Sequence, residues 1–179
     1  TFIFNRSLKE GHVPLSFKEA LITPVPKTDN PSIPSHYRPI SLLPLVSKVL
    51  EKLVAKYWIL PFIKNVDSSQ FAYLPRIGSG TSTVLTLMYN DVLKFLDGTS
   101  GAVRLLALDF TKAFDLLPHD TIFRSCIRCG LPAQAIQWLH SYLTDRRQRT
   151  RCGNDISVWS SVPTGVPQGS VLGPLLFCI

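Results

Sequence analysis

The chain has 179 residues, of which 45% are hydrophobic, and carries a formal net charge of +7 at pH 7. That length and apolar content exclude a disordered tail and predict one domain, or two small lobes, around a buried core. The positive charge favours polyanionic partners, with nucleic acid first and an anionic membrane surface second. Because no apolar run reaches about 18 residues and the first residues lack a signal-peptide pattern, we expect a soluble intracellular protein.

The first half of the chain predicts short helices and strands separated by polar loops. Apolar residues at helical spacing indicate helices, a cluster of Pro, Ser and Asn indicates a loop, and Gly98 suits the end of a helix. The expected elements are a short helix running into a strand over 17–27, a loop over 28–37, an extended segment over 37–43, a helix over 45–63, a loop over 66–80 and a helix over 81–98.

The second half begins with a continuous apolar run over 101–110, which predicts a strand buried on both faces. Alternating helices and strands favour an α+β or α/β architecture. The chain stops inside an apolar helix without a polar cap, so we expect a truncated fragment. The other expected elements are helices over 119–130 and 132–145, a two-stranded ribbon over 146–166 that turns at Gly153 and Asn154, and a helix over 168–179.

The four cysteines are too few and too scattered for a disulfide framework. Cys126 and Cys129 form a CxxC pair inside a helical pattern, and no second pair completes a zinc site. The pattern favours buried or idle thiols, with redox chemistry or metal binding as the alternatives.

Asp109 follows the apolar run directly, at the expected end of a buried strand. A carboxylate at the edge of a core is costly unless it is paired, and a hard divalent cation such as Mg²⁺ would pair with it. The alternative is a helix cap or a surface carboxylate. For Asp115, a structural role as a cap or as a partner of Lys112 or His119 is the favoured interpretation.

Several segments, read in order, carry a more specific signal: PVPK, HYRPISLL, QFAYLPR, LALDFTKAFD and GVPQGSVLGPLLF. In their order and spacing they resemble the reverse transcriptase domain of non-LTR (LINE-type) retrotransposons, from about Ala20 to Ile179. The resemblance implies an α+β right-hand polymerase fold that is incomplete at its C-terminus. Its expected parts are fingers over about 1–78, the first part of the palm over 79–120, an insertion between fingers and palm over 121–164 and a truncated palm helix over 165–179.

The same resemblance implies a metal site and a nucleotide site. Asp109 and the backbone carbonyl of Phe110 would bind Mg²⁺, two ions in the complete enzyme, for nucleotidyl transfer of dNTPs to a primer 3′ end. Phe114 would be the aromatic gate that excludes a ribose 2′-hydroxyl, and its alternative is a core residue. The remaining expected dNTP-binding residues are Lys27 and Arg38 for the triphosphate, and Gln168 and Gly169 for the sugar and the close backbone approach.

A basic cluster before the expected ribbon predicts contacts with phosphates. The candidate nucleic-acid-binding residues are Arg146, Arg147, Arg149 and Arg151, with Arg76 as a possible addition. A solvated basic face is the alternative for the cluster. The chain also has IGSGTS where the family often has Gly-Arg-Ser-Thr, which weakens a template-contact role for the loop that contains Arg76.

The family's Asp-Asp turn, which supplies the other metal-binding carboxylates, is not present in the chain. We therefore expect a fragment of an RNA-directed DNA polymerase that is inactive alone, with RNA template, DNA primer and dNTP as partners. Within a retrotransposon ribonucleoprotein its expected location is the cytoplasm and nucleus. The alternatives are a catalytically dead retroelement remnant that acts as a nucleic-acid-binding module, and an unrelated basic α+β domain whose motifs arise by chance.

Overall fold

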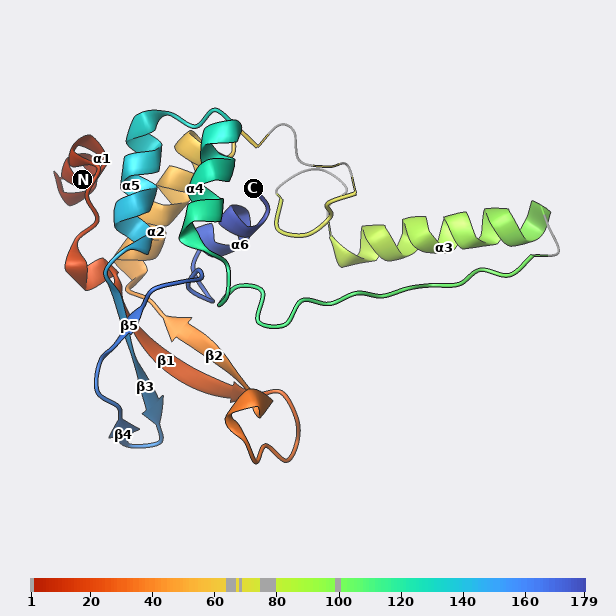
Figure 1. Ribbon diagram of the computed structural model, residues 1–179, viewed down its shortest axis with the longest axis horizontal. Coiled ribbons are helices and arrows are strands. Elements are labelled where there is room, and N and C mark those ends of the chain that lie inside the picture. The colour runs from red at the N-terminus through yellow and green to blue at the C-terminus, as the bar shows by residue number, and fades with distance from the viewer. Residues whose placement is uncertain (1, 64–66, 68, 75–79, 99–100) are drawn as a thin grey trace. The chain divides into compact units, whose positions relative to one another are not determined.

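A computed structural model of the chain describes residues 2–63, 67, 69–74, 80–98 and 101–179 (Figure 1). The chain divides into two compact units. The larger unit comprises Thr1–Asn65, Lys112–Phe177 and Ile179, and the smaller unit comprises Val66–Thr111 and Cys178. The fingers and palm boundaries expected from the sequence stay predictions.

The larger unit contains a mixed sheet in the order β2-β1-β3-β4, with β5 also paired to β3. Strand β1 runs antiparallel to β2 and parallel to β3, and β3 is antiparallel to β4 and β5. The strands are β1 (Glu19–Pro26), β2 (Tyr37–Leu42), β3 (Arg146–Cys152), β4 (Asp155–Ile156) and β5 (Ser160–Val162). In Figure 1 they extend away from the helices, with β4 at the far end.

The two faces of this sheet differ in burial. Because side chains alternate along a strand and register partners share a face, the pairs Val25–Arg38 and Leu21–Arg149 place both arginines on one face. The opposite face carries Ala20 and Ile22, which are 6% and 5% exposed and form a small core cluster with Leu43. The face with the arginines is called the outer face below, and the face with Ala20 and Ile22 is called the inner face.

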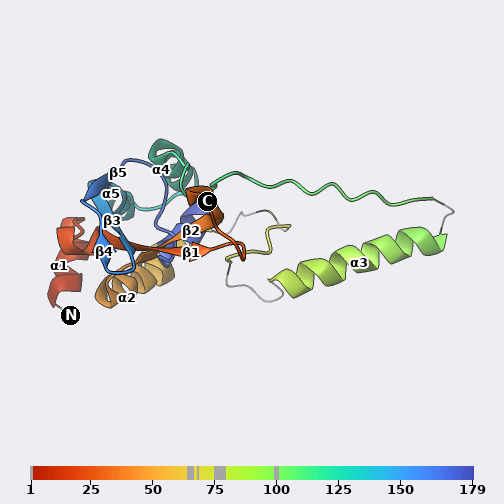
Figure 2. The same cartoon turned by 90° about the horizontal axis from the view of Figure 1, so that it is seen from below.

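The described part of the larger unit also contains the helices α1 (Phe2–Glu10), α2 (Leu45–Val54), α4 (His119–Arg128), α5 (Ala133–Leu143) and α6 (Leu172–Phe177). A π-helical turn, Ala55–Ile59, continues α2, and short 3₁₀ turns cover Leu15–Phe17 and Pro34–His36. Turned by 90°, this unit has α2 and α4 on opposite sides of β1 (Figure 2). The fully buried Trp138 of α5 donates its Nε1–H to Oγ of Ser7 at 2.9 Å, which anchors α1.

The smaller unit contains α3 (Thr81–Gly98), as the sequence predicts, but the strand expected over 101–110 is wrong. That segment has no regular structure, and its side chains are exposed, with Leu108 at 87%. A strand exists only through hydrogen bonds to a neighbouring strand. None of the described strands pairs with this segment, so its high strand propensity is not realised.

Most other expected elements are confirmed, including β1, β2, α2, α4, α5, the β3–β4 ribbon and α6. Helix α1 was not predicted from the sequence. Cys126 is buried, which raises the pKa of its thiol to about 11 and fits the prediction of an idle thiol. No helix in the described part of the chain is long and apolar enough to cross a membrane.

Candidate functional site

The loop 163–169 is fixed against the turn 112–117 by backbone hydrogen bonds. The N–H of Val166 donates to the carbonyl of Phe114 at 2.8 Å, and the N–H of Gly165 donates to the carbonyl of Leu117 at 2.9 Å. Gly165 has φ +79°, and a Cβ there would lie 2.5 Å from the carbonyl oxygen of Asp115. Only glycine therefore allows the two segments to approach this closely.

A second close approach joins the same loop to β2. The N–H of Ser41 donates to the carbonyl of Gln168 at 2.9 Å. Gly169 has φ +101°, and a Cβ there would lie 3.0 Å from the carbonyl oxygen of Ser41. Gly165 and Gly169 thus both have positive φ, and they allow three separate parts of the chain to come together.

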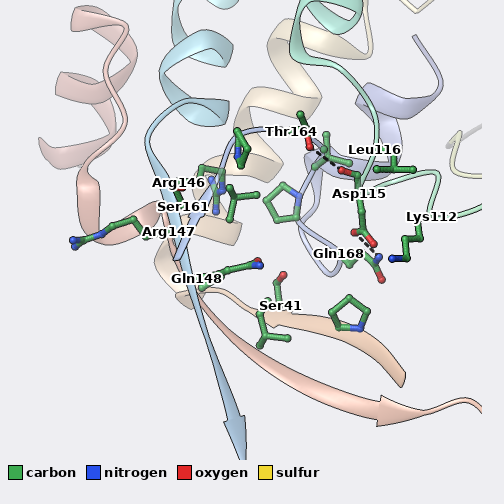
Figure 3. Close-up of a pocket in the computed structure, with 18 residues that line it drawn as sticks. Ser41, Lys112, Asp115, Leu116, Arg146, Arg147, Gln148, Ser161, Thr164 and Gln168 are labelled. Carbon is green, nitrogen blue, oxygen red and sulfur yellow. Dashed lines mark hydrogen bonds between the residues drawn. The ribbon is translucent and has the colours of Figure 1, made fainter. Parts of the chain in front are cut away.

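A pocket of about 360 Å³ lies between this loop, the turn 112–116 and the inner face of the sheet (Figure 3). It is lined by alternate residues of the strands, which include Ala20 and Ile22 of β1 and Ser41 of β2. Its polar lining from the other segments consists of Lys112, Asp115, Arg146, Arg147, Gln148, Ser161, Thr164 and Gln168.

Asp115 and Gln168 are bonded to each other at the edge of this pocket. Nε2 of Gln168 donates to Oδ1 of Asp115 at 2.8 Å, as Figure 3 shows. This bond sets the orientation of the amide, because only its nitrogen can donate to a carboxylate. Asp115 was expected to cap a helix or pair with Lys112 or His119. His119 instead contacts the carbonyl of Gly165 at 2.9 Å through Nε2.

The start of α6 is held by a buried carboxylate. Glu51 of α2 is fully buried, and its Oε2 accepts the N–H groups of Val171 at 2.7 Å and Leu172 at 3.2 Å. Burial raises the pKa of Glu51, and the two backbone hydrogen bonds and Arg146 act in the opposite direction. Glu51 therefore fixes the backbone only a few residues after Gln168.

Arg146 is inside the molecule and not on the surface expected for phosphate contacts. It is 3% exposed, its Nη1 donates to the carbonyl of Tyr142 at 2.9 Å, and its guanidinium lies 4.9 Å from the centre of the Tyr142 ring. Its Nη2 is buried without a hydrogen-bond partner among the described residues. Burial also raises the pKa of Tyr142. The Arg146 side chain thus belongs to the interior beside the pocket.

The expected dNTP-binding residues fall into two groups in the larger unit. Phe114, Gln168 and Gly169 lie on the bonded segments, and the half-buried Phe114 ring is 5.0 Å from that of Phe177. Lys27 and Arg38 lie at the far end of the β1–β2 pair, where Lys27 Nζ donates to the carbonyl of Ser35 at 3.0 Å. The structure therefore places the expected dNTP-binding residues in two parts of the larger unit.

The expected metal site stays a prediction. Asp109 and Phe110 belong to the smaller unit, and both are exposed there. A carboxylate and a backbone carbonyl are oxygen donors that suit a hard divalent cation, but they form only part of a donor set. Within the described ranges, no group of three or more His, Cys, Asp or Glu could hold a metal ion. Arg76 lies outside the described residues.

Three contact residues of the larger unit were not predicted as functional. Asp115 was assigned only a structural role, and Glu51 lies in a helix where nothing in the sequence distinguishes it from its charged neighbours. Trp159 lies 4.6 Å from the Arg149 guanidinium and 5.2 Å from that of Arg147, measured to the ring centre. An aromatic residue close in sequence to a basic cluster is the one signal that could have identified Trp159.

The family model described as "Reverse transcriptase (RNA-dependent DNA polymerase)" matches residues 25–179. The chain is 35% identical over 180 residues to the "Probable RNA-directed DNA polymerase from transposon X-element" of Drosophila melanogaster, covering 100% of the chain and 20% of that protein. It is 34% identical to the "Probable RNA-directed DNA polymerase from transposon BS" of the same species, covering 99% of the chain and 19% of that protein.

A third relative is the "RNA-directed DNA polymerase from mobile element jockey" of Drosophila melanogaster, which is 32% identical over 99% of the chain and 19% of its own length. The chain therefore spans about a fifth of the length of these curated relatives. The resemblance to non-LTR retrotransposon sequences that the ordered motifs suggested is confirmed.

Proposed function

We propose a function from one premise, which is that the chain belongs to the reverse transcriptase (RNA-dependent DNA polymerase) family. It forms the part of an RNA-directed DNA polymerase that receives an incoming deoxynucleotide beside the primer 3′ end. The observation that carries this proposal is the convergence of the turn 112–117, the loop 163–169 and β2. Three separate motifs of the family thereby meet at one place.

In this proposal Gln168 hydrogen-bonds the sugar of the nucleotide, and Phe114 is the gate that rejects a ribose 2′-hydroxyl. The contact between Phe114 and Phe177 supports a gating role, because a ring that packs against another ring is less free to move away from a larger sugar. The same contact is compatible with the alternative of a core residue. Gly169 keeps the backbone close to Ser41 without a side chain in the way.

Arg38 and Lys27 are proposed to bind the triphosphate. Arg38 is exposed and lies about 10 Å along β2 from Ser41, the residue whose N–H bonds Gln168, with its side chain on the outer face of this edge strand. A guanidinium group can bind phosphate oxygens through two parallel hydrogen bonds. Lys27 now donates to the carbonyl of Ser35, so binding a phosphate would require only a rotation of its exposed side chain.

Reverse transcriptases use divalent metal ions, and we propose Mg²⁺ with Asp109 and the carbonyl of Phe110 as ligands. Bound Mg²⁺ would stabilise negative charge on the attacking 3′-oxygen and on the leaving pyrophosphate. Asp109 contributes one carboxylate, and further acidic ligands are needed for two ions. Template RNA and primer DNA are proposed partners, bound through Arg147, Arg149 and Arg151, with Arg76 as a further candidate.

The test is primer extension by the chain in its complete open reading frame, with an RNA template, a DNA primer and Mg²⁺. We expect extension with dNTPs and little with rNTPs. Phe114→Val should increase the use of rNTPs relative to dNTPs by at least tenfold, because it removes the clash with the 2′-hydroxyl. Phe123→Val, which changes an aromatic residue of α4 outside the site, is the matched control. Complete absence of extension would contradict the polymerase proposal.

A second candidate function is nucleic-acid binding without catalysis. One observation favours it, which is that the described residues contain no acidic cluster able to hold a metal ion. Under this alternative, nucleic acid binds with a steep dependence on salt, but no primer is extended with Mg²⁺ or Mn²⁺. Binding and extension measured on the same preparation distinguish the two functions.

A further inference from the structure

The segment 156–160, which joins β4 to β5, contains one residue more than the stretch 148–151 of β3 that lies opposite it. Arg151 pairs with Ile156, and the N–H of Ser157 donates to the carbonyl of Thr150 at 2.9 Å. Beyond this point the register shifts by one, because Gln148 pairs with Ser160. Val158 and Trp159 therefore both lie opposite Arg149. This is a β-bulge, a feature that redirects side chains.

The bulge places Trp159 beside two arginines of β3. Trp159 shares the outer face with Ser161, the register partner of Arg147, and the ring centre is 4.6 Å from the Arg149 guanidinium and 5.2 Å from that of Arg147. Nε of both arginines is buried with no hydrogen-bond partner among the described residues, as expected for guanidinium groups that lie against a ring. The ring restricts both side chains and leaves their terminal nitrogens for other partners.

Arg147, Arg149 and Arg151 form a row on the outer face, which is called the arginine row below. Alternate residues of a strand are spaced by about 6.8 Å on the same face, so the row extends over about 14 Å. Arg147 also forms an ion pair with Glu19. Arg149 and Arg151 have no carboxylate partner among the described residues, so the charge that is available to a ligand lies at these two positions.

We propose that Trp159 is a positioning residue that holds Arg147 and Arg149 in place, so that the arginine row binds the sugar–phosphate backbone of one nucleic-acid strand. This inference rests on the proposed function only in that the partner is a nucleic acid. A linear row of fixed guanidinium groups matches a linear series of phosphates better than it matches a compact anion. The ring restricts Arg147 and Arg149 of this row, and a guanidinium group that is already stacked loses less freedom on binding.

The test measures binding of a labelled single-stranded RNA or DNA oligonucleotide to the 179-residue chain by fluorescence anisotropy over a range of salt concentrations. Trp159→Leu should weaken binding by about fivefold to tenfold, because the apolar volume remains but the attraction of the ring for two guanidinium groups is lost. The salt dependence should be unchanged, because no charge is removed. Trp159→Phe, which keeps an aromatic ring, should restore binding to within about twofold of the wild type.

Two arginine variants test the row independently of Trp159. Arg149→Ala should reduce the slope of log K against log salt by about 0.7, the value for one phosphate contact with a single strand. Arg149→Lys keeps the charge but loses the planar group, so it should weaken binding while preserving the slope. Lys56→Ala, which removes an exposed charge in the turn after α2, is the control and should leave the slope unchanged.

Equal binding by Trp159→Leu and Trp159→Phe would overturn the positioning role. So would an equal change of slope in Lys56→Ala and Arg149→Ala, or a wild-type chain that does not bind the oligonucleotide. Circular dichroism and thermal unfolding identify a Trp159 variant that has lost its fold, and the comparison of Arg149→Lys with the wild type then decides the question. Because primer extension is not measured, failure of this inference is distinct from failure of the polymerase proposal.

Discussion

The loop 163–169 and the segment 101–110 both carry motif residues, yet they are held in different ways. The loop is bonded to the turn 112–117 and to β2 through backbone groups, and two glycines allow these contacts. The segment that carries Asp109 has neither a strand partner among the described residues nor a buried side chain. In the proposed function, nucleotide positioning would therefore rest on local packing, whereas metal binding would rest on Asp109, which the described structure leaves exposed.

Removal of the Asp109 carboxylate should give the largest effect on activity. In the complete open reading frame, Asp109→Ala should reduce primer extension by at least about 1,000-fold, because a metal ligand stabilises the transition state by several kcal/mol. Thermal unfolding of the chain should not change, since the side chain is exposed. Asp97→Ala, which removes a carboxylate near the end of α3, is the control. Extension by Asp109→Ala at the wild-type rate would remove the assigned metal role.

Gly165→Ala, which adds a single methyl group, should destabilise the loop 163–169 more than the same addition at its other glycine, Gly169. A Cβ at Gly165 would lie 2.5 Å from the Asp115 carbonyl oxygen, and φ is +79°. Strain and clash together should lower the free energy of unfolding by more than about 3 kcal/mol. Gly153→Ala is a matched control, because φ is +59° and no atom lies within 4 Å of its Cβ. It should cost only about 1 kcal/mol. Equal losses in chemical denaturation would show that the close approach at Gly165 is not rigid.

A smaller effect is expected from Asp115→Ala, which removes the acceptor that orients Gln168. We expect KM for dNTP to rise about fivefold with little change in kcat, since a hydrogen bond of this kind contributes about 1 kcal/mol. Asp115→Asn keeps an oxygen that can accept the same N–H group, so it should behave like the wild type. A uniform loss of kcat in both variants would indicate a different role for Asp115.

The smallest expected effect concerns pH and Glu51. Burial raises its pKa in the folded state above the ordinary value of 4.5. At and below pH 4.5 the proton is bound in the folded state, and above this pH unfolding releases it, so the free energy of unfolding should fall as pH rises toward the folded-state pKa. Glu51→Gln removes this contribution and still offers an oxygen to the N–H groups of Val171 and Leu172. When measured from pH 4 to 8, the free energy of unfolding of the wild type should fall relative to that of Glu51→Gln as the pH rises.

Local patterns predicted the helices and most strands because their signals lie within a few residues. The apolar period over 45–63, the Gly-Leu-Pro junction at 130–132 and the Gly-Asn turn at 153–154 are such signals, and the structure has the corresponding elements. The strand expected over 101–110 failed for a nonlocal reason. Its composition favours a strand, but a strand requires a partner, and composition does not supply one.

The candidate site shows the same difference between local features, which the sequence predicts, and nonlocal contacts, which it does not. Gln168, Gly169 and Phe114 were predicted because they lie in recognisable motifs, whereas the bond between Asp115 and Gln168 joins residues that are 53 positions apart. The position of Arg146 was missed because four arginines in a short run look alike in sequence. Only the pairing of β3 with β1 and β5 decides which of them point inward.

The alternation along β3 makes this strand unusually sensitive to insertions and deletions. Arg146 contributes to the interior, and its immediate neighbour Arg147 lies on the opposite face beside Trp159. A deletion of one codon just before Arg147 would exchange the faces of the residues that follow it in the strand. Arg147, Arg149 and Arg151 would then point to the inner face, and the outer face would lose its row of cations. Sequence variants of this element should therefore tolerate exchange of one residue for another far better than any change in length.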